Sequence, residues 1–130
     1  MHPLILHLSN ALDEICSVEK DFFSAWGFFK KIPFEELGQR LDVQLAKLES
    51  LMNGFSAMDD DERKSIAIDY IRKLTDSTEH LRHMCLRLQQ KAEGRRYDAS
   101  EYKRDFDSFK RLQTAYFDAG ANMNRILASM

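Results

Sequence analysis

Residues 4–32 read LILHLSNALDEICSVEKDFFSAWGFFKKI, and this stretch decides the fold. Its apolar residues recur at alternating steps of four and three, which is the a/d spacing of a heptad repeat. The members of this stripe are Leu4, Leu8, Ala11, Ile15, Val18, Phe22, Ala25, Phe29 and Ile32. Pro3 suits a first helical turn, and Pro33 disfavours helix at the residue before it. The pattern therefore predicts a long amphipathic helix over residues 4–31.

Three further segments carry apolar stripes of the same kind, and no segment alternates convincingly with the period of a strand. We expect helices over residues 34–53, 59–93 and 98–129. The connections are short, and a fold-back at Pro33 matches the helix lengths, so consecutive helices should lie antiparallel. The sequence thus predicts an all-α fold, an antiparallel up-down-up-down four-helix bundle, with residues 1–130 as one domain. The alternative is a pair of long hairpins that completes its core in a dimer.

The residues that punctuate these segments are typical of helix ends. Gly54 and Gly94 should each end a helix, because glycine is favoured just past the last turn. Ser56, with Asp59 three residues later, offers a cap for the segment that follows. Asp98, followed three residues later by a glutamate, resembles a capping box.

Composition limits the classes of protein to which the chain can belong. Of its 130 residues, 44% are hydrophobic and 31% are charged, which is ordinary for a globular domain. No apolar run approaches the roughly 20 residues that cross a bilayer. A secretory signal requires a basic residue before its apolar run, and none precedes the apolar run at the N-terminus. Cys16 and Cys85 are too few for a disulfide scaffold and fall on apolar helix faces, so we expect both to be buried and reduced. We expect a soluble, cytoplasmic protein with no membrane partner.

Several apolar residues lie away from the core stripes when each helix is projected at 100° per residue. In the first and third segments these are Phe28, Ile68 and Leu86. Phe28, Phe29 and Phe34 also crowd one end of the expected bundle, where an aromatic residue could anchor a partner. We therefore predict a non-catalytic protein-interaction module that binds another protein or a second copy of itself. Its predicted apolar contacts are Phe28, Phe29, Phe34, Ile68 and Leu86.

The formal net charge of −2 conceals an uneven distribution. Residues 82–111 hold nine basic and five acidic residues, a net charge of +4, and the rest of the chain carries −6. The basic residues that we assign to the interaction surface are Arg87, Lys91, Arg95 and Arg96. An acidic protein partner fits this end of the bundle. A nucleic-acid partner does not, because Tyr97 is the one aromatic residue there that could stack on a base.

Asp105 falls near the middle of the apolar stripe of the fourth segment. A carboxylate at such a position needs a hydrogen-bond partner or partial hydration. The indole N–H of Trp26 is a suitable donor at the same level of an antiparallel bundle. We predict a buried polar contact between Trp26 and Asp105 with a structural role.

No catalytic constellation is recognisable, and we predict neither enzyme activity nor a cofactor. The chain has no glycine-rich phosphate loop, no Gly-x-Ser-x-Gly elbow and no Cys-x-x-Cys motif. Glu79, His80 and His83 have spacings that can bring two ligands to one metal, but His83 projects almost opposite the core, so no internal metal site is expected. The alternative function is a bundle that binds a small apolar ligand among its nine Phe and six Met residues.

Overall fold

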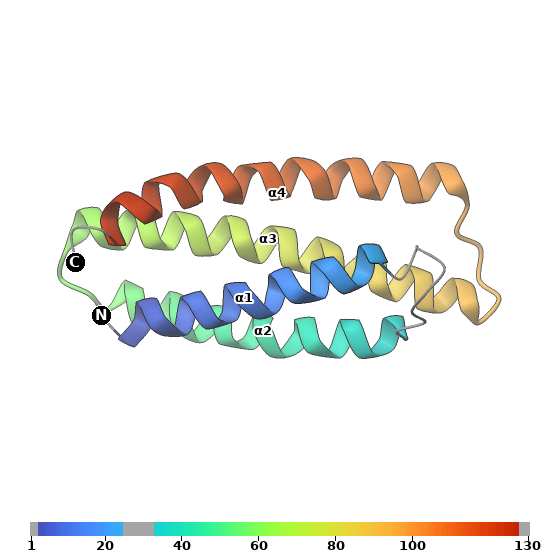
Figure 1. Ribbon diagram of the computed structural model, residues 1–130, viewed down its shortest axis with the longest axis horizontal. Helices are drawn as coiled ribbons and strands as arrows, with labels where there is room; N and C mark the ends of the chain where they lie inside the picture. The colour runs from blue at the N-terminus through green and yellow to red at the C-terminus, as the bar shows by residue number, and fades with distance from the viewer. Residues whose placement is uncertain (1–2, 25–32, 128–130) are drawn as a thin grey trace.

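The computed structural model describes residues 3–24 and 33–127. They form four helices and no strand: α1 (Pro3–Ser24), α2 (Phe34–Ser56), α3 (Asp61–Ala92) and α4 (Ala99–Leu127). Successive helices run in opposite directions, so the start of α1 lies at the same end of the bundle as the end of α4 (Figure 1). The all-α, up-down-up-down four-helix bundle predicted from the heptads is confirmed. Residues 25–31 of the first predicted helix lie outside the described residues.

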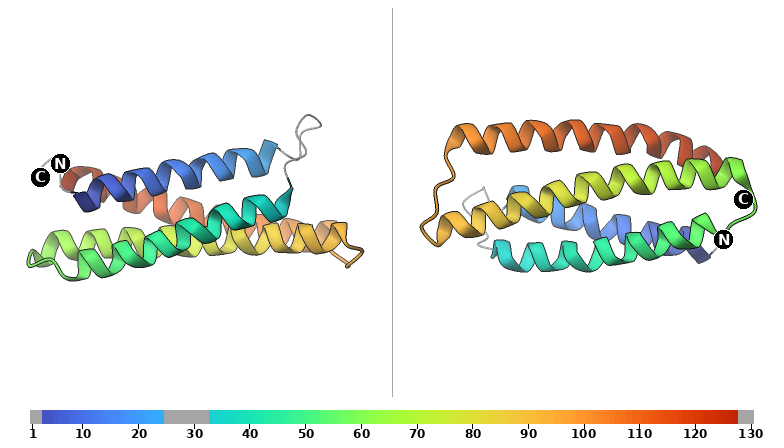
Figure 2. Two further views of the ribbon diagram at one scale, coloured as in Figure 1. Left: turned by 90° about the horizontal axis from the view of Figure 1, so that it is seen from below. Right: turned by 180° about the vertical axis from the view of Figure 1, so that it is seen from behind.

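The four helices are not equally close to one another. α2 and α3 pack along most of their lengths, as do α3 and α4, and α1 packs mainly on α2 (Figure 2). The backbones of α1 and α4 make hardly any close approach to each other. Long side chains must therefore span the space between α1 and α4.

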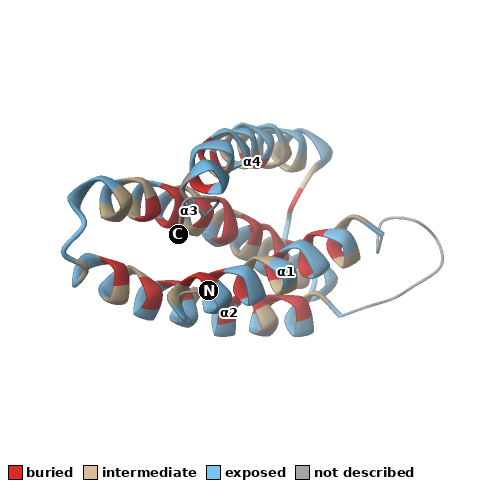
Figure 3. Cartoon of the chain, turned by 60° about the vertical axis from the view of Figure 1, so that its left-hand side comes forward, coloured by how far each residue is buried: buried red, intermediate tan, exposed pale blue. Residues whose placement is uncertain are grey.

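The buried residues of the four described helices face one another in the interior of the bundle (Figure 3). Two clusters of buried side chains fill the interior, one at each end. The cluster at the chain termini is built around Ile15, Leu48, Ile71, Leu74 and Tyr116, each no more than 1% exposed. The other cluster centres on Phe22, Leu41, Leu81 and Phe109, each fully buried. Aliphatic and aromatic burial of this extent is the main source of stability.

The prediction that α2 ends at Gly54 is wrong. The helix continues through Gly54 to Ser56 because Phe55 is needed in the core, where it is 2% exposed. A Cβ atom on Gly54 would lie 2.8 Å from a terminal methyl carbon of Leu4, so the glycine instead lets the first turn of α1 pack against α2. Ser56 does not cap α3, because its hydroxyl donates to the carbonyl oxygen of Met52 within α2.

The other helix ends follow capping rules. Asp60, not Ser56 or Asp59, is the N-cap of α3, and its carboxylate accepts from the backbone N–H of Arg63. α3 ends before Gly94, whose φ of +96° is the left-handed conformation that glycine adopts without strain. Asp98 caps α4 as predicted, since its carboxylate accepts a hydrogen bond from the backbone N–H of Glu101. This hydrogen bond lowers the pKa of Asp98 to about 2.

Arginine side chains fasten neighbouring helices at the surface. Arg40 of α2 reaches α1, where it donates to Glu14 and Asp21 at 2.9 Å each and to the hydroxyl of Ser17. Arg82 of α3 donates two hydrogen bonds to the carboxylate of Asp42 on α2. Such fork-shaped contacts fix the register of two helices more than they add to stability.

The core assignment makes a direct prediction for Leu74, which is fully buried at the centre of α3. Leu74→Ala should lower the free energy of unfolding by about 2–5 kcal/mol, because it removes buried methyl groups and leaves a void. Val43→Ala, at a site that is 54% exposed, should change it by no more than about 0.5 kcal/mol. Urea unfolding followed by circular dichroism measures both values. Equal effects of the two substitutions would contradict the burial pattern.

Candidate functional site

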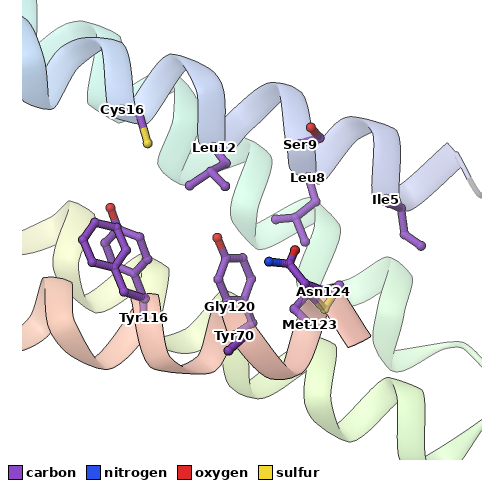
Figure 4. A pocket seen from close by; sticks show the side chains of 12 residues that line it. Ile5, Leu8, Ser9, Leu12, Cys16, Tyr70, Tyr116, Gly120, Met123 and Asn124 are labelled. Atoms are coloured by element: carbon purple, nitrogen blue, oxygen red, sulfur yellow. The ribbon is translucent and has the colours of Figure 1, made fainter. Parts of the chain in front are cut away.

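A hollow lined mostly by apolar side chains lies between α1 and α4, with Tyr70 of α3 at its floor (Figure 4). Its volume is about 420 Å³, which falls within the range of small-molecule pockets, about 300–1,000 Å³. It exists because α1 packs on α2 and leaves α4 at a distance. The residues that line it are Ile5, Leu8, Ser9, Leu12, Cys16, Tyr70, Tyr116, Phe117, Gly120, Ala121, Met123 and Asn124. We call this hollow the α1–α4 cavity.

A few polar groups interrupt the apolar lining of the α1–α4 cavity. The ring of Tyr70 rises from α3 so that its hydroxyl points into the space facing α1 (Figure 4). Tyr70 is only 5% exposed, yet its hydroxyl makes no hydrogen bond to the described part of the chain. The Cys16 thiol and the Asn124 amide face the same space from α1 and α4. The hydroxyl of Tyr70 therefore takes its hydrogen-bond partner from solvent or from a bound molecule.

Glu19 lies behind the lining of the α1–α4 cavity, where it contacts the lining residue Tyr116. Its side chain is 8% exposed and connects α1 to α4, since it accepts from the hydroxyl of Tyr116 at 2.9 Å and from the amide of Gln113 at 3.1 Å. Burial raises the pKa of Glu19, while these two donors lower it by stabilising the charged form. Both donors give their hydrogens to Glu19, so the arrangement suits a carboxylate rather than a protonated acid.

Neither Glu19 nor Tyr70 is among the site residues predicted from the sequence. A signal for each was present, because Glu19 stands four residues after Ile15 and three before Phe22, and so shares their helix face. Tyr70 has the same relation to buried positions of α3, at three residues after Ala67 and four before Leu74. What spacing alone could not reveal is that α4 stands away from α1 at this level.

The prediction that both cysteines are buried is half right. Cys85 is 1% exposed, and burial raises its pKa to about 12. Cys16 is exposed and lines the α1–α4 cavity, so its assignment to the core is wrong. It flanks the heptad stripe beside Ile15, and with no close helix opposite, it stays open to solvent. Partial burial and the charges of Glu19 and Asp13 raise its pKa, which makes it a weak nucleophile.

The described residues include only three members of the predicted apolar contact surface, Phe34, Ile68 and Leu86. Phe28 and Phe29 lie outside the described residues. Phe34 is only partly exposed and packs edge-on against Phe22 with ring centroids 5.7 Å apart, so it belongs to the core rather than to a free surface. Ile68 is likewise partly buried against the core, and only Leu86 is exposed, at 36%.

The basic surface is only partly free. Arg87 lies over the ring of Tyr97, 4.4 Å from its centroid, and forms an ion pair with Glu101, so it fastens α3 to α4. Tyr97 is 3% exposed and not available for stacking on a base. The cations Lys91, Arg95 and Arg96 are exposed, and Arg96 is paired weakly with Asp98 at 3.5 Å.

Asp105 has a hydrogen-bond partner, but it is Tyr97. The hydroxyl of Tyr97 donates to the Asp105 carboxylate at 2.6 Å, and Nε2 of His80 donates to the backbone carbonyl oxygen of Asp105 at 2.7 Å. Trp26, the donor expected from the sequence, lies outside the described residues. Because the tyrosine precedes α4 and the histidine is on α3, the two bonds hold the start of α4 in register with α3.

His80 is thus engaged in a structural contact, and its ring centroid is 6.2 Å from that of His83. Over residues 3–24 and 33–127, no group of three or more His, Cys, Asp or Glu side chains is placed to hold a metal ion. No described helix has a stretch that is long and apolar enough to span a bilayer. Comparison with known protein families, with curated proteins and with solved structures finds no match.

The buried position of Glu19 predicts a pH-dependent stability. Because its pKa is raised in the folded protein, the folded state binds more protons than the unfolded state just above the ordinary glutamate value. The contribution of Glu19 to the free energy of unfolding is therefore lost as the pH rises through its raised pKa. Glu19→Gln removes this dependence, so its unfolding free energy relative to the natural protein should increase as the pH rises above the ordinary glutamate pKa.

Urea unfolding at a series of pH values measures this difference. Glu49→Gln removes the same charge from an exposed position on α2 and serves as the control. Its difference from the natural protein should stay nearly constant over the same range. A constant difference for Glu19→Gln as well would show that Glu19 does not titrate in a buried setting.

Proposed function

We propose that this protein is a helical bundle that binds a small, largely apolar ligand in the α1–α4 cavity. The cavity is large enough for a ligand with a two-ring body, and most of its lining is aliphatic or aromatic. Phe117, at the cavity rim, is 57% exposed, the highest value among the large apolar residues described. A bound apolar molecule would cover this ring and gain from the burial of both surfaces.

The observation that carries the proposal is the hydroxyl of Tyr70. It belongs to a side chain that is 95% buried, points into the cavity and has no hydrogen-bond partner in the described part of the chain. The hydroxyl opens onto the cavity, so it is not among the described side-chain atoms that are sealed from solvent without a partner, and water can reach it. A ligand with one polar group at the right end would take the place of that water and accept or donate the hydrogen bond. Pockets for small molecules combine an apolar wall with a few such groups.

The proposal predicts that N-phenyl-1-naphthylamine, an uncharged fluorescent probe, binds the purified protein with increased emission. Gly120→Leu should weaken this binding at least about tenfold, because the new side chain projects into the cavity. Gly120 lines the cavity, and a Cβ atom there meets only a ring carbon of Tyr70, at an ordinary 3.5 Å. Titration of the probe against each variant gives the dissociation constants.

Gly120→Ala is the matched control. Its single methyl group fits the available space, so probe binding should change little while the helix gains about 1 kcal/mol of stability. Circular dichroism verifies that all three proteins are folded. Absence of binding to the natural protein, or equal binding by Gly120→Leu, would overturn the proposal.

A second candidate function is the interaction with another protein, or with a second copy of this chain, that the sequence predicts. It is supported by the cations at the α3–α4 end. Lys91, Arg95, Lys103 and Arg104 are exposed and form no ion pair with the described residues. Such a concentration of unpaired charge favours an acidic partner by attraction that weakens with salt.

A fluorescein-labelled polyglutamate peptide tests the second candidate at low ionic strength. Arg95→Glu should weaken its binding about fivefold, since one attraction is lost and one repulsion gained, together about 1 kcal/mol. Lys47→Glu makes the same charge change at an exposed position of α2 and should have a smaller effect. Equal effects of the two variants in fluorescence anisotropy would remove the case for a localised surface.

A further inference from the structure

The charge around the α1–α4 cavity is one-sided. None of its twelve lining residues carries a formal charge. The charged groups that act on the thiol of Cys16, one of the lining residues, are acidic, namely Glu19 and Asp13 of α1. Lys110 interacts with Glu19, and its ammonium group lies 5.6 Å from the ring centroid of Phe106; like the two carboxylates, it does not line the cavity. The lining therefore offers no cation, and the charges that reach Cys16 from behind it are negative.

Glu19 is placed to act on the cavity lining through its charge. It shares a hydrogen bond with Tyr116, which lines the cavity directly, and it stands one helical turn from Cys16. After burial, which is the larger cause, the Glu19 charge contributes to the raised pKa values of both Cys16 and Tyr70. Its carboxylate thus acts on two groups that face the bound molecule. A cationic ligand group is favoured in such a field and an anionic one is opposed.

Aromatic rings line the same end of the cavity. Tyr70 and Tyr116 are arranged edge to face with ring centroids 6.5 Å apart, and Phe117 lies 4.7 Å from Tyr116 in the same manner. Ring faces attract an ammonium group through their quadrupole, most strongly where water is partly excluded. The free hydroxyl of Tyr70 can also accept a hydrogen bond from such a group. Aromatic faces and a nearby carboxylate are a combination suited to an organic cation.

We infer that the ligand of the α1–α4 cavity is a small apolar amine, whose ammonium group lies at the Tyr70 and Tyr116 end, near Glu19. This inference rests on the proposed function and names the chemical class of its ligand. An apolar carboxylate of the same size finds no cation in the lining and is repelled by Glu19. An uncharged alcohol satisfies Tyr70 but gains nothing from the carboxylate.

Three probes with one apolar body test the inference: 1-naphthylmethylamine, 1-naphthalenemethanol and 1-naphthoic acid. We expect the amine to bind about tenfold more tightly than the alcohol, and the alcohol more tightly than the acid, in calorimetric titrations at neutral pH. Glu19→Gln should reduce the preference for the amine over the alcohol to less than about threefold. Glu49→Gln, which removes an equal charge at an exposed site on α2, should preserve it.

Tyr70→Phe provides a second variant whose folding does not depend on Glu19. It should weaken the amine and the alcohol several-fold each and leave 1-methylnaphthalene, which has no polar group, unaffected. If all naphthalene probes bind equally, or the acid binds best, the inference about the amine is overturned while the proposed function stands. If none of the probes binds, and N-phenyl-1-naphthylamine does not bind either, both fall.

Discussion

The hydrogen bond from Tyr116 to Glu19 is the interaction on which the shape of this bundle depends. It crosses from α4 to α1, the pair of neighbouring helices whose backbones stay apart, and it lies in a buried position. A carboxylate inside a bundle is stable only when donors reach it, and here a hydroxyl and an amide from α4 do so. These long side chains hold the two helices together at a separation that apolar contact alone would not maintain.

The separation of α1 from α4 explains why the interior is uneven along its length. α1 is held to α2 rather than to α4. Arg40 of α2 contacts Glu14 and Asp21, on either side of Glu19, and Gly54 of α2 lets the first turn of α1 approach closely. Beyond Glu19 along α1, Phe23 spans the gap and packs against Phe106 and Phe109 of α4. Phe23 thus closes one half of the interface, and the α1–α4 cavity is the half where α1 has no phenylalanine, tyrosine or tryptophan that reaches α4.

Heptad spacing predicted the class, the order and the packing direction of the helices because a stripe of apolar residues can be buried in few ways. Capping signals identified Asp98 and Gly94, whose roles depend only on local backbone geometry. The predictions for Gly54 and Cys16 were wrong because both positions depend on a second helix: α1 comes close to Gly54, whereas α4 stays away from Cys16. The cavity is a property of helix separation, and no single helix carries a signal for it.

Two features that weaken the fold meet at this cavity. Gly120 lies in the interior of α4, where alanine would fit beside Tyr70 and would be more favourable by about 1 kcal/mol. Glu19 is buried at a place where its spacing alone would suit an apolar residue. A sequence selected only for a stable bundle would fill the space beside both. The glycine widens the hollow, and the carboxylate places a negative charge behind its lining. Both costs are therefore explained together by the ligand binding that we propose for this cavity.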